Sequence, residues 1–314
     1  MNKIKFLLRM LFKFGPLAVG YYSINMVVVW LLIQKDTQKL AAIKHPYILV
    51  KVLGKDMFLD TADRGIAVDL FIAKEREKHF ATYFRNNILK SGQTVIDIGA
   101  NIGYYVLQEA SIADFVYAIE PISKNINLLQ RNIAISNIRN VKVFKTAIGN
   151  MTGLVNMGVS HSGNLCSIRI KGYATEKVPI TTLDEFVKTH NIQPDVIRMD
   201  VEGYCTEIIE GGLKTLRENN VIICMELHPV VLSERPDAYL IMIGRLQQLG
   251  YEIAFASREI PCSIINHPLL PVMDTFGRIA GFKSGQVNIK LNDLLKPMYQ
   301  DGLHNAVEII LRKK

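Results

Sequence analysis

Cysteine and tryptophan are scarce in this sequence, which contains four cysteines and one tryptophan among 314 residues. The cysteines, Cys166, Cys205, Cys224 and Cys262, lie far apart and form no C-x-x-C pair. This spacing argues against a disulfide framework and against a zinc site, and it is typical of reduced thiols in a cytosolic domain. Cys224 lies in an apolar, strand-like run, so we expect it to be a small core residue.

Excess positive charge is nearly absent from the body of the chain, although the formal net charge of the whole sequence is +8. Residues 1–50 contain seven Lys or Arg and one Asp, a net charge of +6, which leaves +2 for the other 264 residues. A groove for nucleic acid needs a basic surface on the folded domain. We therefore expect no nucleic-acid partner.

The first 46 residues are expected to form a separate amphipathic and hydrophobic helical segment. Residues 1–13 place basic side chains on one helical stripe among apolar ones, as in helices that lie on anionic membranes. Residues 14–33 carry no charge and are just long enough to span a bilayer, although Gly, Pro, Ser and Asn dilute their first half. We expect membrane contact through residues 1–33. Packing of two helices on the domain and a secretory signal are the alternatives.

Residues 47–314 are expected to form one α/β domain. Its first segment, residues 47–91, is expected to contain a hairpin and a helix. The hairpin is expected at 47–60 and the helix at 74–90. Strands are then expected at 94–98, 115–120, 141–145, 195–200, 221–227, 251–256 and 306–311; helices from 103 and at 123–136, 182–190, 204–218 and 237–249; a hairpin excursion at 149–172; and an insertion at about 258–305. This alternation, with short connections, predicts a mostly parallel sheet with helices on both faces. Ligands of such sheets bind at the carboxyl ends of the strands.

The segment VIDIGANIGYYVL lacks the nucleotide-binding motifs that its position after a strand suggests. A dinucleotide fingerprint needs three glycines where this sequence has Gly99, Asn101 and Tyr104, and no G-K-[ST] follows for a P-loop. The remaining pattern is D-x-G-x-x-x-G, in which Asp97 precedes the turn and Gly103 opens the next helix. The plain alternative is a tight strand-to-helix corner whose glycines relieve crowding.

The charges around this turn favour one kind of nucleotide. An acid at Asp97 repels a pyrophosphate and suits a ligand with a cationic group. Glu120, expected at the end of the next strand, can accept both hydroxyls of a ribose, and it repels a 2′-phosphate. S-adenosylmethionine has a ribose, a sulfonium and an amino group but no phosphate. The pattern therefore favours S-adenosylmethionine over NAD.

Five segments in order carry a resemblance to a known family: VIDIGANIGYYVL, VYAIEPISKNINLLQRNI, TAIGNMTG, VIRMDVEGY and MELHP. Over about residues 57–230 the chain resembles the FkbM family of S-adenosylmethionine-dependent methyltransferases. The resemblance implies a class I methyltransferase (Rossmann-like) fold, whose seven-stranded sheet has an antiparallel last strand that residues 306–311 could supply. It also implies O-methylation of hydroxyls on polyketides, sugars or lipid-linked glycans. The chain departs from the family at Cys205, where Glu is usual, and at Arg198, where Lys is common.

The resemblance also assigns the cofactor contacts. It implies a methionine-side loop formed by Asp97, Gly99, Asn101 and Gly103, a ribose held by Glu120, and an adenine contacted by Ala147 and Ile148.

Removal of the hydroxyl proton needs a base within hydrogen-bond reach. Four residues at the expected carboxyl ends of strands are candidates: Asp200, Glu202, Glu226 and His228. We expect Asp200 to be the base or the acceptor of the substrate hydroxyl, with Glu202 and His228 in support. Glu202 could instead cap the following helix, and His228 could be an ordinary loop residue. Asp200, Glu226 and His228 could also bind a divalent metal, but the sequence alone establishes none, so no metal site is predicted.

Two other functions stay open from the sequence. The departure at Cys205 permits a membrane-attached binding module that keeps the fold without catalysis. Nitrogen methylation is the other, although the Asn/Asp-Pro-Pro-Tyr/Phe motif of amino-methylating enzymes is absent. Because S-adenosylmethionine is made in the cytosol, we expect a cytoplasmic catalytic domain and attachment of the N-terminal segment in the plane of the membrane. The expected partner is a small-molecule or glycan hydroxyl acceptor.

Overall fold

The computed structural model describes residues 38–63, 65–159, 166–167, 174–228, 237–258, 285–286 and 307–314. Residues 1–37 and most of the insertion at 258–305 lie outside this range, so the predictions of membrane contact and of the insertion stay predictions. Within the described ranges, none of the helices has both the length and the apolar character needed to cross a membrane.

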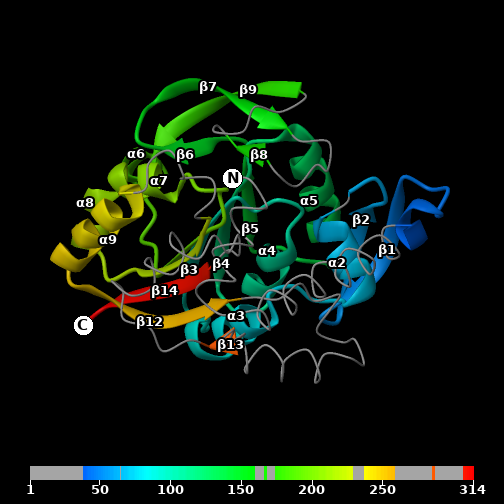
Figure 1. Cartoon of the computed structure of the whole chain (residues 1–314), viewed down its shortest axis with the longest axis horizontal. Helices are drawn as coiled ribbons and strands as arrows, with labels where there is room; N and C mark the ends of the chain where they lie inside the picture. The colour runs from blue at the N-terminus through cyan, green and yellow to red at the C-terminus, as the bar shows by residue number, and fades with distance from the viewer. Residues whose placement is uncertain are drawn as a thin grey trace, which may run out of the picture.

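A mostly parallel sheet forms the centre of the domain, with strand order β13-β12-β14-β11-β10-β3-β4-β5 (Figure 1). Its strands in chain order are β3 (Thr94–Ile98), β4 (Phe115–Ile119), β5 (Val141–Phe144), β10 (Val196–Met199), β11 (Ile222–Leu227), β12 (Tyr251–Arg258), β13 (Gly285–Gln286) and β14 (Val307–Lys313). β14 is antiparallel to both of its neighbours, β11 and β12. Seven of these strands confirm the predicted sheet and its antiparallel last strand, and the two-residue β13 extends the edge.

Side chains of β3 alternate between two hydrophobic layers, one on each face of the sheet. Ile96 and Ile98 belong to the layer that α6 (Leu183–Thr189), α7 (Cys205–Glu210), α8 (Leu213–Glu218) and α9 (Ala238–Gln248) complete. Val95 belongs to the opposite layer, which α2 (Ile66–Ile72), α3 (Lys78–Tyr83), α4 (Tyr104–Glu109) and α5 (Ser123–Ile135) help to build. A strand with period two and both faces covered is typical of a parallel sheet. The predicted α/β architecture is confirmed.

The leading segment forms a hairpin, as predicted, from β1 (Tyr47–Val52) and β2 (Lys55–Asp60). The helix predicted at 74–90 begins later, because Lys74 and Glu77 adopt left-handed backbone conformations with φ of 61° and 47°. α3 therefore starts at residue 78 and continues into a short π-helical segment, η1 (Phe84–Ile88). The turn before α3 carries Arg76 towards the carboxyl edge of the sheet, where it lines a cavity.

The helix predicted at 204–218 is two helices, α7 and α8, which Gly211 and Gly212 separate. A Cβ at Gly211 would lie 2.0 Å from the carbonyl oxygen of Gly149, so only glycine permits this close packing. Gly149 ends β6 (Ala147–Gly149), and the contact fixes α7 beside β6.

A second, four-stranded sheet of order β6-β9-β7-β8 lies beside the carboxyl edge of the main sheet (Figure 1). It adds β7 (Gly153–Val159), β8 (Cys166–Ser167) and β9 (Ala174–Thr182) to β6. The hairpin excursion predicted at 149–172 corresponds to β7 and β8, whereas β9 was not predicted. This sheet contributes one wall of the cavity described below.

Candidate active site

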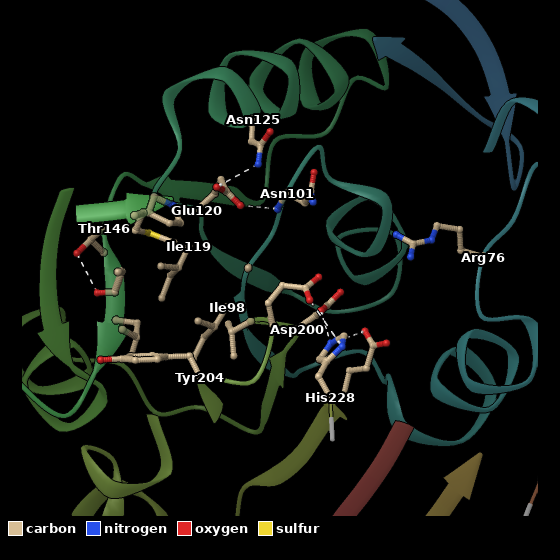
Figure 2. Close-up of a pocket in the computed structure, with 18 residues that line it drawn as sticks. Arg76, Ile98, Asn101, Ile119, Glu120, Asn125, Thr146, Asp200, Tyr204 and His228 are labelled. Carbon is tan, nitrogen blue, oxygen red and sulfur yellow. Dashed lines mark hydrogen bonds and ion pairs between the residues drawn. The ribbon is translucent and has the colours of Figure 1, made fainter. Parts of the chain in front are cut away.

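A cavity of about 280 Å³ lies at the carboxyl ends of the central strands (Figure 2). Glu120 and Asn101 lie at one end, and Asp200 and His228 lie at the other. We call these the cofactor end and the reaction end. Six of the seven predicted cofactor residues and all three predicted catalytic residues follow β3, β4, β10 or β11 or lie in β6, but not all of them reach the cavity.

The loop from β3 to α4 bends sharply through three left-handed residues: Gly99, Asn101 and Gly103, with φ of 85°, 49° and 96°. A Cβ at Gly99 would lie 2.1 Å from the backbone oxygen of Asp200, so glycine lets the two loops of the site meet. Gly99 also lines the cavity, and Asn101 lines it with its side chain. Gly103 does not line it and packs instead against Leu129, 2.7 Å from where a Cβ would stand.

Asp97 lies within β3 and does not line the cavity, so its predicted place in the methionine-side loop stays a prediction. It is fully buried in β3, and its Oδ1 accepts a hydrogen bond from Arg198 Nη1 at 3.0 Å. The two residues are register partners on β3 and β10, so their side chains lie on the same face of the sheet. Because side chains alternate along β3, Asp97 points to the same face of the sheet as Val95, into the hydrophobic layer that contains Val95, and not into the cavity.

Arg198 links Asp97 to the reaction end. Its Nη2 lies 3.5 Å from Asp200 Oδ2, and its guanidinium carbon lies 3.7 Å from the centre of the Tyr105 ring. A buried guanidinium needs paired carboxylates, and the aromatic face adds a favourable cation–π contact. Arg198 was noted in the sequence only as a departure from the family. Its place opposite Asp97 in the predicted strands was the signal that could have revealed this pairing.

Glu120 directly follows β4 and is only 4% exposed. Its carboxylate accepts hydrogen bonds from the backbone N–H groups of Asn101 and Ile122, both at 2.9 Å, and from the Asn125 amide at 3.3 Å. Burial raises the pKa of Glu120 to about 7, and these three donors oppose the rise. The carboxylate is thus held firmly in place at the wall of the cavity.

The cofactor end carries a buried polar atom without a partner. Among the described residues, Asn101 Oδ1 has no hydrogen-bond donor although it is buried. Such an atom is costly unless a ligand donates to it. Ala147 and Ile148 of β6 line the cavity with Met157 and give it an apolar wall. A carboxylate, an unsatisfied acceptor and an apolar wall fit a ligand that has ribose hydroxyls, an amino group and a flat base.

Three carboxylates surround the His228 ring at the reaction end. Nε2 lies 3.6 Å from Asp200 Oδ1 and 3.5 Å from Glu226 Oε2, and Nδ1 lies 3.6 Å from Glu202 Oε2. Glu202 occupies a left-handed turn with φ of 49°, directly before Gly203 with φ of 84°. This turn directs Glu202 back over the cavity instead of along the following helix. The N-cap residue of α7, Tyr204, makes no side-chain cap hydrogen bond, and Glu202 lines the cavity.

The titratable groups at the reaction end shift one another's pKa values. Burial alone would raise the pKa of Asp200, but interaction with His228 and the charge of Arg198 hold it below its usual value. Burial raises the pKa of both Glu202 and Glu226 to about 7. Burial would lower the pKa of His228, but Glu226, Asp200 and Glu202 raise it well above its usual value. These carboxylates and His228 therefore act as one electrostatic unit.

Arg76 and Tyr204 are among the residues that line the cavity and that the sequence analysis missed. Arg76 Nη2 lies 3.2 Å from Glu77 Oε1, and its Nε lies 3.5 Å from Asp69 Oδ2. It comes from the leading segment, not from a strand end, so topology alone gave no signal for it. Cys205, whose departure from the family raised doubt, is fully buried in α7 and does not line the cavity.

The strand order, with an antiparallel strand between β11 and β12, and a cavity at the carboxyl edge define the class I methyltransferase fold. A family model described as the methyltransferase FkbM domain matches residues 97–253, which is half of the chain. The chain therefore belongs to the FkbM methyltransferase family, and its cofactor is S-adenosylmethionine.

Solved structures of other methyltransferases are similar at low identity. The FkbM methyltransferase from Methylobacillus flagellatus is 17% identical with a TM-score of 0.42, and the match covers 76% of this chain and 58% of that one. An rRNA methylase from Streptococcus thermophilus is 10% identical with a TM-score of 0.43, covering 76% of this chain and 97% of that one. TYW2 of M. jannaschii, in complex with AdoMet, is 14% identical with a TM-score of 0.41, covering 86% and 88%. Comparison with curated protein sequences gave no match.

Proposed function

We propose that this methyltransferase transfers a methyl group to a hydroxyl of a sugar, a lipid-linked glycan or another small molecule. One observation carries the proposal: a single cavity joins the Glu120 carboxylate at one end to Asp200, Glu202 and His228 at the other. A nucleoside held at the first end would direct its reactive group to the second. The acceptor would then be met by carboxylates, which bind hydroxyl groups well.

The residues of the cofactor end would hold S-adenosylmethionine. Glu120 would accept the ribose hydroxyls, Asn101 would accept a hydrogen bond through its unpartnered Oδ1, and Ala147 and Ile148 would contact the adenine. When bound, this cofactor supplies a methyl carbon whose bond to sulfur breaks, with the electron pair left on sulfur, as the acceptor oxygen bonds to that carbon.

Asp200 would orient the acceptor and take its proton. An ionised carboxylate at the cavity wall accepts a hydrogen bond from a substrate O–H, which fixes the oxygen for in-line approach. As the oxygen forms its new bond, it gains positive charge and its hydrogen becomes strongly acidic. A carboxylate as weakly basic as Asp200 can therefore accept the proton late in the reaction. His228 and Glu202 would keep Asp200 in place through the contacts at 3.6 Å.

Methyl transfer from isotope-labelled S-adenosylmethionine tests the proposal. Purified protein is incubated with glycan, lipid-linked glycan and small-molecule fractions of a membrane extract, and the products are analysed by mass spectrometry. We expect a labelled O-methyl group in one product, which Asp200→Asn fails to form. Cofactor binding without any labelled product would favour a non-catalytic module, and a label on nitrogen would favour an N-methyltransferase.

A further inference from the structure

We propose that the reaction end of the cavity is a binding site for a divalent cation, with Asp200, Glu226 and His228 as its ligands. Their ligand atoms lie within 4.8 Å of one another. His228 Nε2 is 3.6 Å from Asp200 Oδ1 and 3.5 Å from Glu226 Oε2, too far for good hydrogen bonds. Metal–ligand bonds of about 2.1 Å in tetrahedral or octahedral geometry separate neighbouring ligand atoms by roughly 3.0–3.4 Å. Small side-chain shifts would therefore close the three atoms around an ion.

His228 Nε2 is a buried ring nitrogen without a hydrogen-bond partner among the described residues. Nδ1 faces Glu202 Oε2 at 3.6 Å, and a carboxylate behind a ligating imidazole is a common arrangement at metal sites. It orients the ring and fixes the proton on the nitrogen that faces away from the ion. The ring therefore presents Nε2 to Asp200 and Glu226.

A second, independent observation comes from the strand behind the site. Glu226 of β11 and Glu308 of β14 are direct register partners, so their carboxyl groups lie on the same face of the sheet. Glu308 is 3% exposed, and its Oε1 has no hydrogen-bond partner in the described part of the chain. Glu77 brings a third carboxylate within 4.8 Å of these two. Glu226 belongs both to this acidic group and to the proposed ligand set, so a cation bound at the reaction end would also offset part of the acidic excess beside Glu308.

The arginines near the site form salt bridges with carboxylates other than Glu226 and Glu308. Arg76 faces Asp69 and Glu77, and Arg198 faces Asp97 and Asp200. Neither has a salt bridge to Glu226 or Glu308 among the described residues. A metal ion between Glu226, Asp200 and His228 would supply the positive charge that these arginines do not.

One imidazole and two carboxylates suit Mn²⁺ or Zn²⁺ better than Mg²⁺, which prefers oxygen ligands alone. All three ligands line the cavity, so the remaining coordination positions would face it. An acceptor oxygen could complete the coordination and would become more acidic beside the ion. That role rests on the proposed function, whereas the binding site itself does not.

Binding of Mn²⁺ to the full-length protein, without cofactor or acceptor, tests the site. Electron paramagnetic resonance follows the loss of the free Mn²⁺ signal, and Mg²⁺ and Zn²⁺ are added as competitors. We expect one bound Mn²⁺ per chain and binding weaker by about tenfold or more in Asp200→Asn, Glu226→Gln and His228→Gln. Circular dichroism melting confirms that each variant is folded.

Glu120→Gln is the matched control, since it makes the same acid-to-amide change at the other end of the same cavity. We expect it to keep Mn²⁺ affinity while it loses affinity for S-adenosylmethionine. A wild-type protein that leaves the free Mn²⁺ signal unchanged would overturn the metal site, as would equal Mn²⁺ binding by wild type and all three ligand variants. If Mn²⁺ binds as expected but no methyl transfer is found, the metal site stands and the proposed function fails.

Discussion

The two ends of the cavity are built in different ways. At the cofactor end, one carboxylate, Glu120, is fixed mainly by backbone N–H groups of the loops that follow β3 and β4. At the reaction end, Asp200, Glu202, Glu226 and His228 are fixed by one another's charges. At the cofactor end, the backbone therefore determines the position of the carboxylate. The reaction end is an electrostatic balance that a proton or a metal ion can change, so the two ends should respond differently to the same kind of substitution.

The largest effect is expected for Asp200→Asn at the reaction end. The amide cannot take a proton, so we expect kcat to fall about a hundredfold or more. The Kd for S-adenosylmethionine, measured by calorimetry, should change little because Asp200 lies at the opposite end from Glu120. A variant that loses cofactor affinity as strongly as turnover would show that the two ends are not separate.

Glu120→Gln is the corresponding change at the cofactor end. The amide keeps one acceptor oxygen but places an NH₂ group against the N–H donors of Asn101, Ile122 and Asn125. We expect cofactor binding to weaken about tenfold or more, because hydrogen bonds to a buried charge are lost. Glu252→Gln is the control, since the Glu252 side chain is 46% exposed and forms a salt bridge with Lys314 on the surface. Equal cofactor affinity in wild type and Glu120→Gln would remove Glu120 from the binding site.

Most of the sheet could be predicted from the sequence because its strands have a strong hydrophobic pattern. β3 begins and ends at the predicted residues, and the other predicted strands differ from prediction by at most two residues at either end. β9 and the break between α7 and α8 were missed. The break depends on contact between Gly211 and Gly149, which are far apart in the sequence, so no local pattern reveals it.

Site residues could be predicted from the sequence where their position at the end of a strand brings them to the cavity. They could not be predicted where the direction of the side chain determines whether they reach it. Glu120, Asp200 and His228 follow strands or end them, and all three line the cavity. Asp97 does not line the cavity, because its position in β3 faces Arg198 inside a layer. Arg76 was missed because a left-handed turn in the leading segment, not a strand end, brings it to the cavity.

Gly99 lies where the two ends meet, and Gly99→Ala is expected to disturb both. Gly92→Ala is a matched control, because Gly92 has φ of 86° and Gly99 has φ of 85°, but a Cβ at Gly92 would meet nothing within 4 Å. Both variants should lose about 1 kcal/mol of stability for the left-handed backbone. Gly99→Ala should lose about 1–3 kcal/mol more, since its Cβ would overlap the backbone oxygen of Asp200. Equal denaturation midpoints for the two variants would mean that this contact does not constrain the site.

The smallest effect is expected from pH at the cofactor end. Burial raises the pKa of Glu120 to about 7, above the 4.5 of a free glutamate. Only the ionised carboxylate accepts both ribose hydroxyls, so cofactor affinity should rise by up to about tenfold between pH 6 and pH 8. Glu120→Gln should flatten this rise.

The stability of the cofactor-free protein should instead fall as pH rises over the same range. A folded pKa above the unfolded one gives stability that is present below about pH 4.5 and is lost as pH rises through about 7. Across this range the affinity for the cofactor, measured by calorimetry as 1/Kd, should therefore rise while the denaturant midpoint of the cofactor-free protein falls. If affinity and midpoint change in the same direction, Glu120 is not the group that titrates.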